Sequence, residues 1–123
     1  MKKLIILLFS IGQVLNATTY YVAKTGNDRN NGINSPFLTI QRGVNFLRAG
    51  DTLYVRAGVY SERVIVADHN GTADNPIVIT AFPNERPIID GANVDLGGDG
   101  EGLVSICSSY VRLNGFVIRN ADM

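Results

Sequence analysis

The sequence has few of the residues that covalent or redox chemistry uses. Its 123 residues include one cysteine, Cys107, one histidine, His69, and no tryptophan. A single cysteine excludes an internal disulfide framework, so we expect no disulfide partner. Cys107 lies in the apolar run LVSICSS, which favours a small core residue, and the histidine lies in a polar loop. A Cys–His catalytic pair is therefore not expected, and we assign no catalytic residue.

Charge of one sign is also lacking. Lysine and arginine together number 11, as do aspartate and glutamate, for a formal net charge of zero. No block of basic residues and no stripe of alternating basic and aromatic residues occurs. Nucleic acid is therefore not expected as a partner.

Long hydrophobic runs are absent except at the start, where residues 4–11 are almost continuously apolar. This run is far shorter than the roughly 20 residues that span a bilayer. It follows Lys2 and Lys3 and leads to the small residue Ala17, which is the order of a secretory signal peptide. We predict a signal peptide over residues 1–17, cleavage after Ala17, and an extracellular or periplasmic protein with no membrane segment after cleavage. Roughly 106 residues would remain, enough for one small domain.

The segment after this run predicts one strand and one helix. The β-branched and aromatic run TTYYVA, residues 18–23, predicts a strand. Ser35 suits a helix N-cap, Pro36 suits the first turn, and Gly50 suits the end of a helix of about 12 residues. Gly43 weakens its interior by about 1 kcal/mol relative to alanine. The predicted apolar stripe has four members: Phe37, Ile40, Val44 and Leu47.

From Asp51 onward, seven short runs rich in Val, Ile, Leu and Tyr follow one another without a second helical pattern. Val55 and Ile79 occupy similar runs about two dozen positions apart, a period that fits one coil of a parallel β-helix. A β-sandwich is the alternative, but it would favour tight hairpin turns, and Asn70 and Gly71 lie in a long polar loop. We therefore predict an all-β chain, the N-terminal part of a right-handed parallel β-helix.

The predicted helix has an architectural role in such a fold. The first coil of a solenoid would expose an open core and unpaired strand edges. A helix with one apolar face, placed just before that coil, would cover them. We predict a capping region over residues 18–50 and the first coils over residues 51–123. Gly50 and Gly58 would allow sharp corners, and Asp51 would bond to its own turn.

The stretch GNDRNNG, residues 26–32, resembles a calcium loop, but its spacing is wrong for an EF-hand. Counted from Asp28, Gly32 falls on the fifth position, where an oxygen ligand is needed. Thr39 falls on the twelfth, where a bidentate glutamate is needed. We interpret the stretch as a turn, stitched by Asn and Asp side chains, between the first strand and the helix.

Longer stretches resemble a known family. The segments YYVAKTGNDRNNGINSPFLTIQ, AGDTLYVRAGVYSE, GTADNPIVITAFPNERPIIDG and SSYVRLNGFVIRNA are similar to secreted right-handed parallel β-helix proteins of the pectate-lyase-like superfamily. The middle segments also resemble polysaccharide lyase families 9 and 6. The resemblance covers residues 20–121. It implies the fold more specifically than the reaction, because non-catalytic β-helix proteins open in the same way.

The resemblance implies a parent protein that cleaves uronate-containing polysaccharide by β-elimination. In such lyases calcium neutralises the uronate carboxylate and a lysine or arginine removes the neighbouring proton. Those groups lie on later coils in the family, so we expect no cofactor in this segment, calcium in the full-length parent, and an inactive chain. Because Met123 directly follows a strand-like run, we expect a chain truncated at its C-terminus. The alternatives are an intact small solenoid held by a partner, and a non-catalytic secreted β-helix protein that binds glycans or surfaces.

Two groups of residues are candidate binding sites in this segment. Outward-facing arginines on stacked strands could form a ladder that grips an acidic polysaccharide through bidentate hydrogen bonds. These are Arg56, Arg63, Arg112 and Arg119. The glycine-rich insert DLGGDGE offers three carboxylates to a hard cation such as calcium: Asp95, Asp99 and Glu101. Tyr60 and Tyr110 could stack on sugar rings or simply cover the solenoid. Solvated strand faces and a solvated loop are the alternatives for the first two groups.

Overall fold

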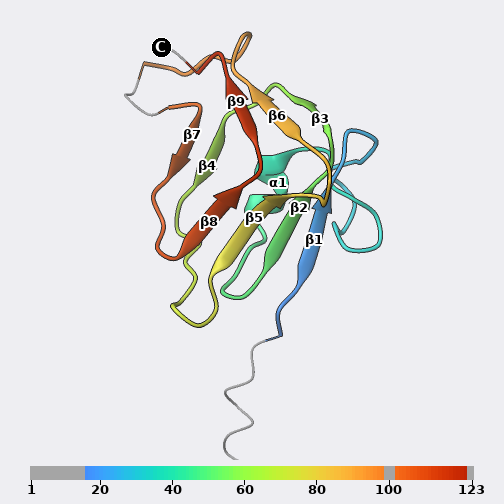
Figure 1. Cartoon of the computed structure of the whole chain (residues 1–123), viewed down its shortest axis with the longest axis vertical. Helices are drawn as coiled ribbons and strands as arrows, with labels where there is room; N and C mark the ends of the chain where they lie inside the picture. The colour runs from blue at the N-terminus through green and yellow to red at the C-terminus, as the bar shows by residue number, and fades with distance from the viewer. Residues whose placement is uncertain (1–15, 99–101, 122–123) are drawn as a thin grey trace, which may run out of the picture.

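The computed structural model describes residues 16–98 and 102–121, which form strands and one short helix (Figure 1). The elements, in chain order, are β1 (Thr19–Val22), α1 (Ile40–Val44), β2 (Thr52–Val55), β3 (Gly58–Tyr60), β4 (Val64–Val66), β5 (Ile77–Ala81), β6 (Pro87–Asp90), β7 (Val104–Ile106), β8 (Val111–Asn114) and β9 (Val117–Arg119). Each predicted strand run contains a strand, and VYSERVIVA contains two, β3 and β4.

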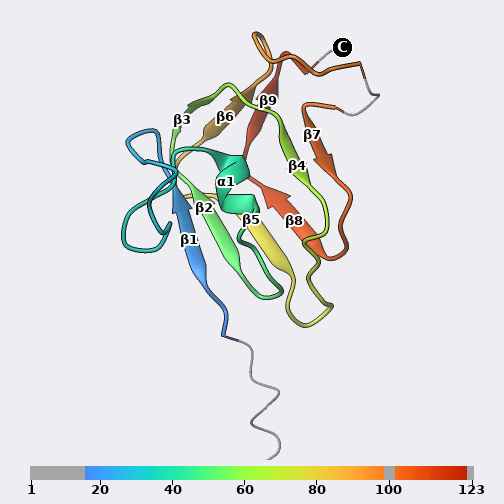
Figure 2. The same ribbon diagram turned by 180° about the vertical axis from the view of Figure 1, so that it is seen from behind.

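The strands form three parallel sheets, as Figures 1 and 2 show from opposite sides. One sheet has the order β1-β2-β5-β8, the second β3-β6-β9 and the third β4-β7. Successive coils, β2-β3-β4 and β5-β6-β7, thus add one strand to each sheet, and β8-β9 begins the next coil. This arrangement is a parallel β-helix, which confirms the predicted fold class.

The register places similar side chains one above another in the four-stranded sheet. Tyr20, Leu53, Ile79 and Leu113 are mutual partners in successive strands and form one inward row. Val55 pairs with Ala81, and Leu53 with Ile79. The repeat between these two strands is therefore two residues longer than the spacing of Val55 and Ile79, in line with the predicted period of about two dozen residues. The apolar runs alone did not fix the register, because each run offers two inward residues.

The predicted apolar stripe is buried, but two of its four residues, Phe37 and Leu47, lie outside the helix. Phe37 and Val44 are 0% exposed and Leu47 is 2% exposed, yet α1 spans only Ile40–Val44. Phe37 precedes the helix and makes a parallel β-bridge with Val22. Thr39, not Ser35, is the N-cap; its side chain accepts a hydrogen bond from the Arg42 backbone N–H. Pairing with β1 thus holds the first predicted turn in extended backbone.

The helix closes one end of the solenoid. It packs against β1, β2 and β4 and lies in front of the strands in Figure 2. Gly43 allows the close approach, because a Cβ there would lie 2.7 Å from a Leu53 methyl group. The glycine that weakens the isolated helix therefore brings its backbone onto the core. The first helical N–H groups, of Ile40 and Gln41, donate to the Glu62 carboxylate at 3.0 and 2.9 Å.

The predicted corner before β2 is present. Gly50 has φ +89°, a backbone region that favours glycine. Asp51, 3% exposed, accepts a hydrogen bond from the Arg48 backbone N–H at 2.9 Å, as expected for a residue that bonds its own turn. Gly58 also has a positive φ, +148°, at the start of β3.

The sequence-based expectation for Cys107 differs from the structure. Cys107 is exposed, not a core residue. Ile106, the residue before it, pairs with Val66 across β4 and β7 but is itself 41% exposed, so the end of this apolar run lies at the open side of the stack. The glycine-rich insert follows β6 and precedes β7, so it lengthens the second coil.

Candidate functional site

The GNDRNNG stretch uses its polar side chains to bind its own backbone and the helix start. Asp28 accepts hydrogen bonds from the backbone N–H groups of Leu38 and Thr39 and from the Thr39 hydroxyl. Burial alone would raise the pKa of Asp28, but the hydrogen bonds from Thr39 and Leu38 lower it below its ordinary value. Asn31 accepts from the Ile33 and Asn34 N–H groups. The stretch is the stitched turn that its sequence indicates.

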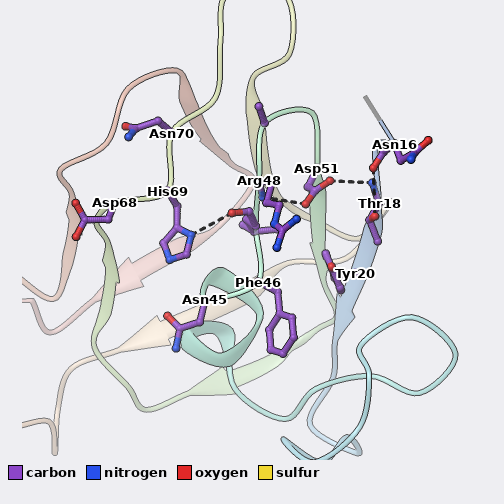
Figure 3. A pocket seen from close by; sticks show the side chains of 12 residues that line it. Asn16, Thr18, Tyr20, Asn45, Phe46, Arg48, Asp51, Asp68, His69 and Asn70 are labelled. Atoms are coloured by element: carbon purple, nitrogen blue, oxygen red, sulfur yellow. Dashed lines mark hydrogen bonds between the residues drawn. The ribbon is translucent and has the colours of Figure 1, made fainter. Parts of the chain in front are cut away.

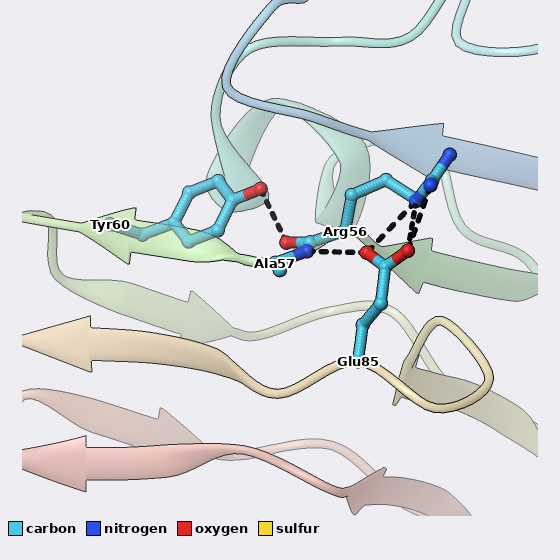
Figure 4. Close-up of polar contacts among 4 residues, drawn as sticks. All are labelled: Arg56, Ala57, Tyr60 and Glu85. Carbon is cyan, nitrogen blue, oxygen red and sulfur yellow. Dashed lines mark hydrogen bonds and ion pairs between the residues drawn. The ribbon is translucent and has the colours of Figure 1, made fainter.

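Arg56 is bonded to a residue of the neighbouring coil. Its guanidinium nitrogens contact both carboxylate oxygens of Glu85, with Nη2 2.8 Å from Oε2, and Glu85 also accepts from the Ala57 N–H (Figure 4). The guanidinium lies 4.1 Å from the ring centre of Phe82. The Arg56 bond, with the Ala57 N–H, lowers the pKa of Glu85, and the same bond raises the pKa of Arg56. This corner joins two coils, so the Arg56 guanidinium is not free to bind an anionic ligand.

Tyr60 is part of the same corner. It is 0% exposed, and its hydroxyl donates to the Arg56 carbonyl at 2.8 Å (Figure 4). Burial, followed by the charges of Glu62 and Glu85, raises the pKa of Tyr60 to about 12. Tyr60 therefore supports the coil and cannot stack on a sugar. Tyr110, in contrast, is 59% exposed with φ +54°.

Arg119 and Arg63 also bind within the protein. Arg119 Nε donates to Asp90 at 2.8 Å, and Asn120 Nδ2 donates to the other oxygen of Asp90. The Asn120 bond, the Ala92 backbone N–H and Arg119 lower the pKa of Asp90 to about 2. Arg63 donates to carbonyl oxygens of the β6–β7 connection.

Arg112 differs from the other three arginines. It is exposed on β8, beside Val78 of β5. Within residues 16–98 and 102–121, its guanidinium has no hydrogen bond or ion pair. The four arginines come from different sheets and corners, so the structure does not bring them together in the predicted ladder.

The acidic insert is described only in part. Asp95 is exposed and accepts a hydrogen bond from the Gly97 N–H at 2.8 Å. Asp99 and Glu101 lie outside the described residues. Among the residues that the structure describes, no group of three or more His, Cys, Asp or Glu side chains could hold a metal ion.

The outer face of the four-stranded sheet carries a cluster of aromatic rings. Tyr21 and Tyr54 are register partners on β1 and β2, with ring centres 5.9 Å apart. Phe82, just after β5, lies 5.8 Å from Tyr54 in an edge-on arrangement. In the same outward row, Thr80 and Asn114 continue the line over β5 and β8. This face, with Arg112 on its last strand, offers aromatic, hydroxyl, amide and cationic groups side by side.

A polar cavity of about 900 Å³ lies at the capped end (Figure 3). Its walls come from the start of β1, the segment after α1 and the loop after β4. The lining residues are Asn16, Thr18, Tyr20, Asn45, Phe46, Leu47, Arg48, Ala49, Asp51, Asp68, His69 and Asn70. His69 Nδ1 is fixed 3.0 Å from the Leu47 carbonyl.

Sequence reasoning missed this cavity because its walls are far apart in the chain. One signal was present in the sequence: Phe46 lies off the predicted apolar stripe. In the structure it is 39% exposed. Its ring stacks on Phe37 at 5.1 Å, and the Arg42 guanidinium lies 5.0 Å from its centre. Asp68, at the opposite wall, has the unusual φ of +62° for a non-glycine residue.

Comparison with known proteins decides the family. The family model described as the Pel9A-like, right-handed β-helix region matches residues 20–123. The chain belongs to this family. Its Pel9A-like region is 39% identical over 77 residues to pectate lyase PEL9 of Emericella nidulans, which covers 61% of the chain and 19% of that protein. It is 36% identical over 75 residues to the uncharacterized protein YwoF of Bacillus subtilis strain 168, covering 60% of the chain and 16% of that protein.

Solved structures agree with the Pel9A-like fold. A rhamnogalacturonan lyase has a TM-score of 0.68 and 28% identity, covering 83% of the chain and 28% of that protein. The complex of XylC with xylose has a TM-score of 0.56 and 40% identity, covering 59% of the chain and 12% of that protein. The chain thus spans less than a third of each of these proteins. Within residues 16–98 and 102–121, no helix is long and apolar enough to cross a membrane.

Proposed function

We propose that the chain is the cap and first coils of a secreted lyase that cleaves uronate-containing polysaccharide by β-elimination. The observation that carries this proposal is the Pel9A-like family match over almost the whole described chain. A lyase among the curated relatives and another among the similar structures support the reaction class. In this proposal the signal peptide directs export, and the catalytic coils lie in other parts of the parent protein.

The described carboxylates form no group of three or more that could hold a metal ion, and five of them are already bonded within the protein. Those of Asp28, Asp51 and Glu62 each accept hydrogen bonds from protein backbone N–H groups. The Glu85 and Asp90 carboxylates are bonded to arginines. A hard cation needs six to eight oxygen ligands, and these oxygens are already used. In this proposal these residues therefore take no part in catalysis, and the calcium is bound by coils outside the described residues.

The role left to this segment is to position the later coils and to contact substrate. Arg112 is the arginine that we assign to such a contact, since Arg56, Arg63 and Arg119 are held by other groups. An exposed guanidinium can pair with a uronate carboxylate through two parallel hydrogen bonds. The neighbouring outward row, with Tyr54 and Asn114, would add ring and amide contacts to a sugar chain.

The reaction is tested with the 123-residue chain itself. It is incubated with polygalacturonate and calcium, and the ultraviolet absorbance of unsaturated products is followed. We expect no turnover. Clear turnover would refute the assignment of the catalytic coils to other parts of the parent, and loss of that turnover with a chelator would direct attention to Asp95, Asp99 and Glu101.

The alternative function is a non-catalytic β-helix protein that binds glycans, and the exposed Arg112 beside the aromatic row favours it. Affinity electrophoresis in gels that contain polygalacturonate or a neutral glucan measures binding without catalysis. We expect retardation by polygalacturonate only, and a several-fold weaker effect in Arg112→Ala. Arg29→Ala, which removes another exposed arginine, is the matched control. Equal retardation of both variants would remove Arg112 from the site.

A further inference from the structure

Asp51 contacts the backbone directly before β1, the first strand of the four-stranded sheet. Its Oδ1 accepts a hydrogen bond from the Thr18 backbone N–H at 2.8 Å, and its Oδ2 accepts from the Arg48 N–H at 2.9 Å (Figure 3). The residue is only 3% exposed. A buried carboxylate thus lies against the backbone nitrogen of Thr18.

Thr18 is also the first residue that the sheet engages. Its carbonyl accepts from the Thr52 N–H at 3.0 Å, and β1 begins at the next residue. Asn16 and Ala17, directly before it, are exposed. A cut between Ala17 and Thr18 would therefore leave every hydrogen bond of the β1–β2 ladder in place.

Such a cut changes the chemistry of the nitrogen that Asp51 holds. A signal peptidase adds water across the Ala17–Thr18 peptide bond, which leaves a carboxylate on Ala17 and an α-amino group on Thr18. At neutral pH that group is mainly an ammonium. The amide N–H···carboxylate bond is then replaced by a charge-assisted bond between opposite charges, which is shorter and stronger.

We propose that Asp51 is the receptor for the α-ammonium of a processed N-terminus at Thr18, so that export processing itself fastens the first strand to the first coil. This inference rests on the export in the proposed function. Four further charged or titratable groups line the same cavity: Tyr20, Arg48, Asp68 and His69. Of all the charged groups that line the cavity, Asp51 is the one that contacts the Thr18 nitrogen. Its charge therefore has the largest effect on that nitrogen.

The sign of the pH effect follows from this pairing. A carboxylate in contact with an ammonium raises the pKa of the amine above the ordinary value of a free terminus. The added stability is fully present below the pKa of the unfolded chain and is lost as pH rises through the folded-state pKa. The processed protein should therefore lose thermal stability between about pH 7.5 and 10 more steeply than a variant without the pair.

The experiment uses the full chain, exported from a bacterial host with its own leader. Intact mass and N-terminal sequencing identify the first residue, and the pH dependence of α-amine modification by an amine-reactive reagent reports its pKa. We expect Thr18 as the first residue and modification about tenfold slower near pH 7 than at an unpaired terminus. Asp51→Asn should remove this shift. A different first residue, or identical pH profiles in both proteins, would overturn the proposal.

A second variant keeps the test valid if Asp51→Asn does not fold. One glycine inserted between Ala17 and Thr18 leaves Asp51 and the sheet intact but moves the new terminus by one residue, about 3.5 Å. We expect its α-amine to titrate as a free terminus and its thermal stability to depend less on pH from about pH 7.5 to 10. If the insertion leaves the pH profile unchanged, Asp51 does not bind the terminus. No glycan enters either measurement, so this result is independent of the proposed lyase function.

Discussion

Asp28 and Thr39, which are 11 positions apart in the sequence, are joined by two hydrogen bonds. The Thr39 hydroxyl donates to Asp28 Oδ2 at 2.7 Å and the Thr39 N–H donates to Oδ1 at 2.9 Å. Because Thr39 is also the N-cap of α1, this pair fixes the loop and the start of the capping helix together. In the stretch that resembles a calcium loop, the carboxylate of Asp28 is therefore bonded to protein N–H and O–H groups.

Replacing Asp28 by alanine should lower the free energy of unfolding by about 1–3 kcal/mol, because three hydrogen bonds to one carboxylate are lost. The lowered pKa of Asp28 means that its contribution is present above its unfolded-state pKa and is lost as pH falls through the folded-state value. Urea unfolding at pH 7 and at successively lower pH below about 4 measures both effects. Asp74→Ala, at an exposed aspartate, is the control. An undiminished difference between wild type and Asp28→Ala at low pH would contradict this role.

Glu62 should behave in the opposite way with pH. Burial, which outweighs its hydrogen bonds from Gln41 and Ile40, raises its pKa. For an acid with a raised folded-state pKa, stability declines as pH rises from the ordinary value toward the folded-state value. Glu62→Ala should cost about 1–3 kcal/mol, because it leaves two helix N–H groups without their acceptor.

Glu62→Gln keeps one acceptor oxygen and should therefore cost less than Glu62→Ala, while removing the pH-dependent part. Thermal unfolding of both variants from pH 4 to pH 7 measures the difference. A steeper decline in Glu62→Gln than in wild type would show that Glu62 does not titrate as described.

The Arg56–Glu85 pair should contribute a small and salt-sensitive coupling. The two side chains are 46% and 25% exposed, and exposed ion pairs are screened by salt. A double-mutant cycle with Arg56→Ala, Glu85→Ala and the double variant isolates the interaction. We expect a favourable coupling at low salt that shrinks in 1 M sodium chloride. An equal coupling at both salt concentrations would indicate packing of Arg56 on Phe82 instead.

Gly91 should tolerate no side chain. A Cβ at this position would lie 2.2 Å from the Asn120 carbonyl oxygen of the next coil, so the backbone would have to move. Gly91→Ala should lower stability by about 1–3 kcal/mol or more. At Gly102 the nearest atom to an added Cβ is 3.7 Å away, so Gly102→Ala is the matched control. Similar urea midpoints for the two variants would disprove the close stacking of these coils.

The sequence alone identified the buried residues more reliably than the secondary structure that those residues form. Phe37, Ile40, Val44 and Leu47 were assigned to one apolar face, and all four are core residues. The helix itself is shorter than predicted. The spacing of apolar residues indicates which of them are buried, but it does not show that Phe37 pairs with Val22 of β1, on the far side of the Asn- and Gly-rich loop. Tertiary contact therefore overrode the local helical preference at this end.

The candidate sites were less predictable for the same reason. That arginines fall on or beside strands is visible in the sequence, but their partners are not: Glu85 is 29 residues from Arg56, and Asp90 is 29 residues from Arg119. These partners meet only after the coils stack.

Local composition and periodicity thus determined the strands, the turn at Asp28 and the parallel β-helix. The strand register, the committed arginines, the outward Cys107 and the contact of Asp51 with Thr18 were decided by the tertiary structure. The physical reason is that these features depend on loop lengths and on the stacking of the coils. Stacking brings residues that are one coil apart in the chain into direct contact.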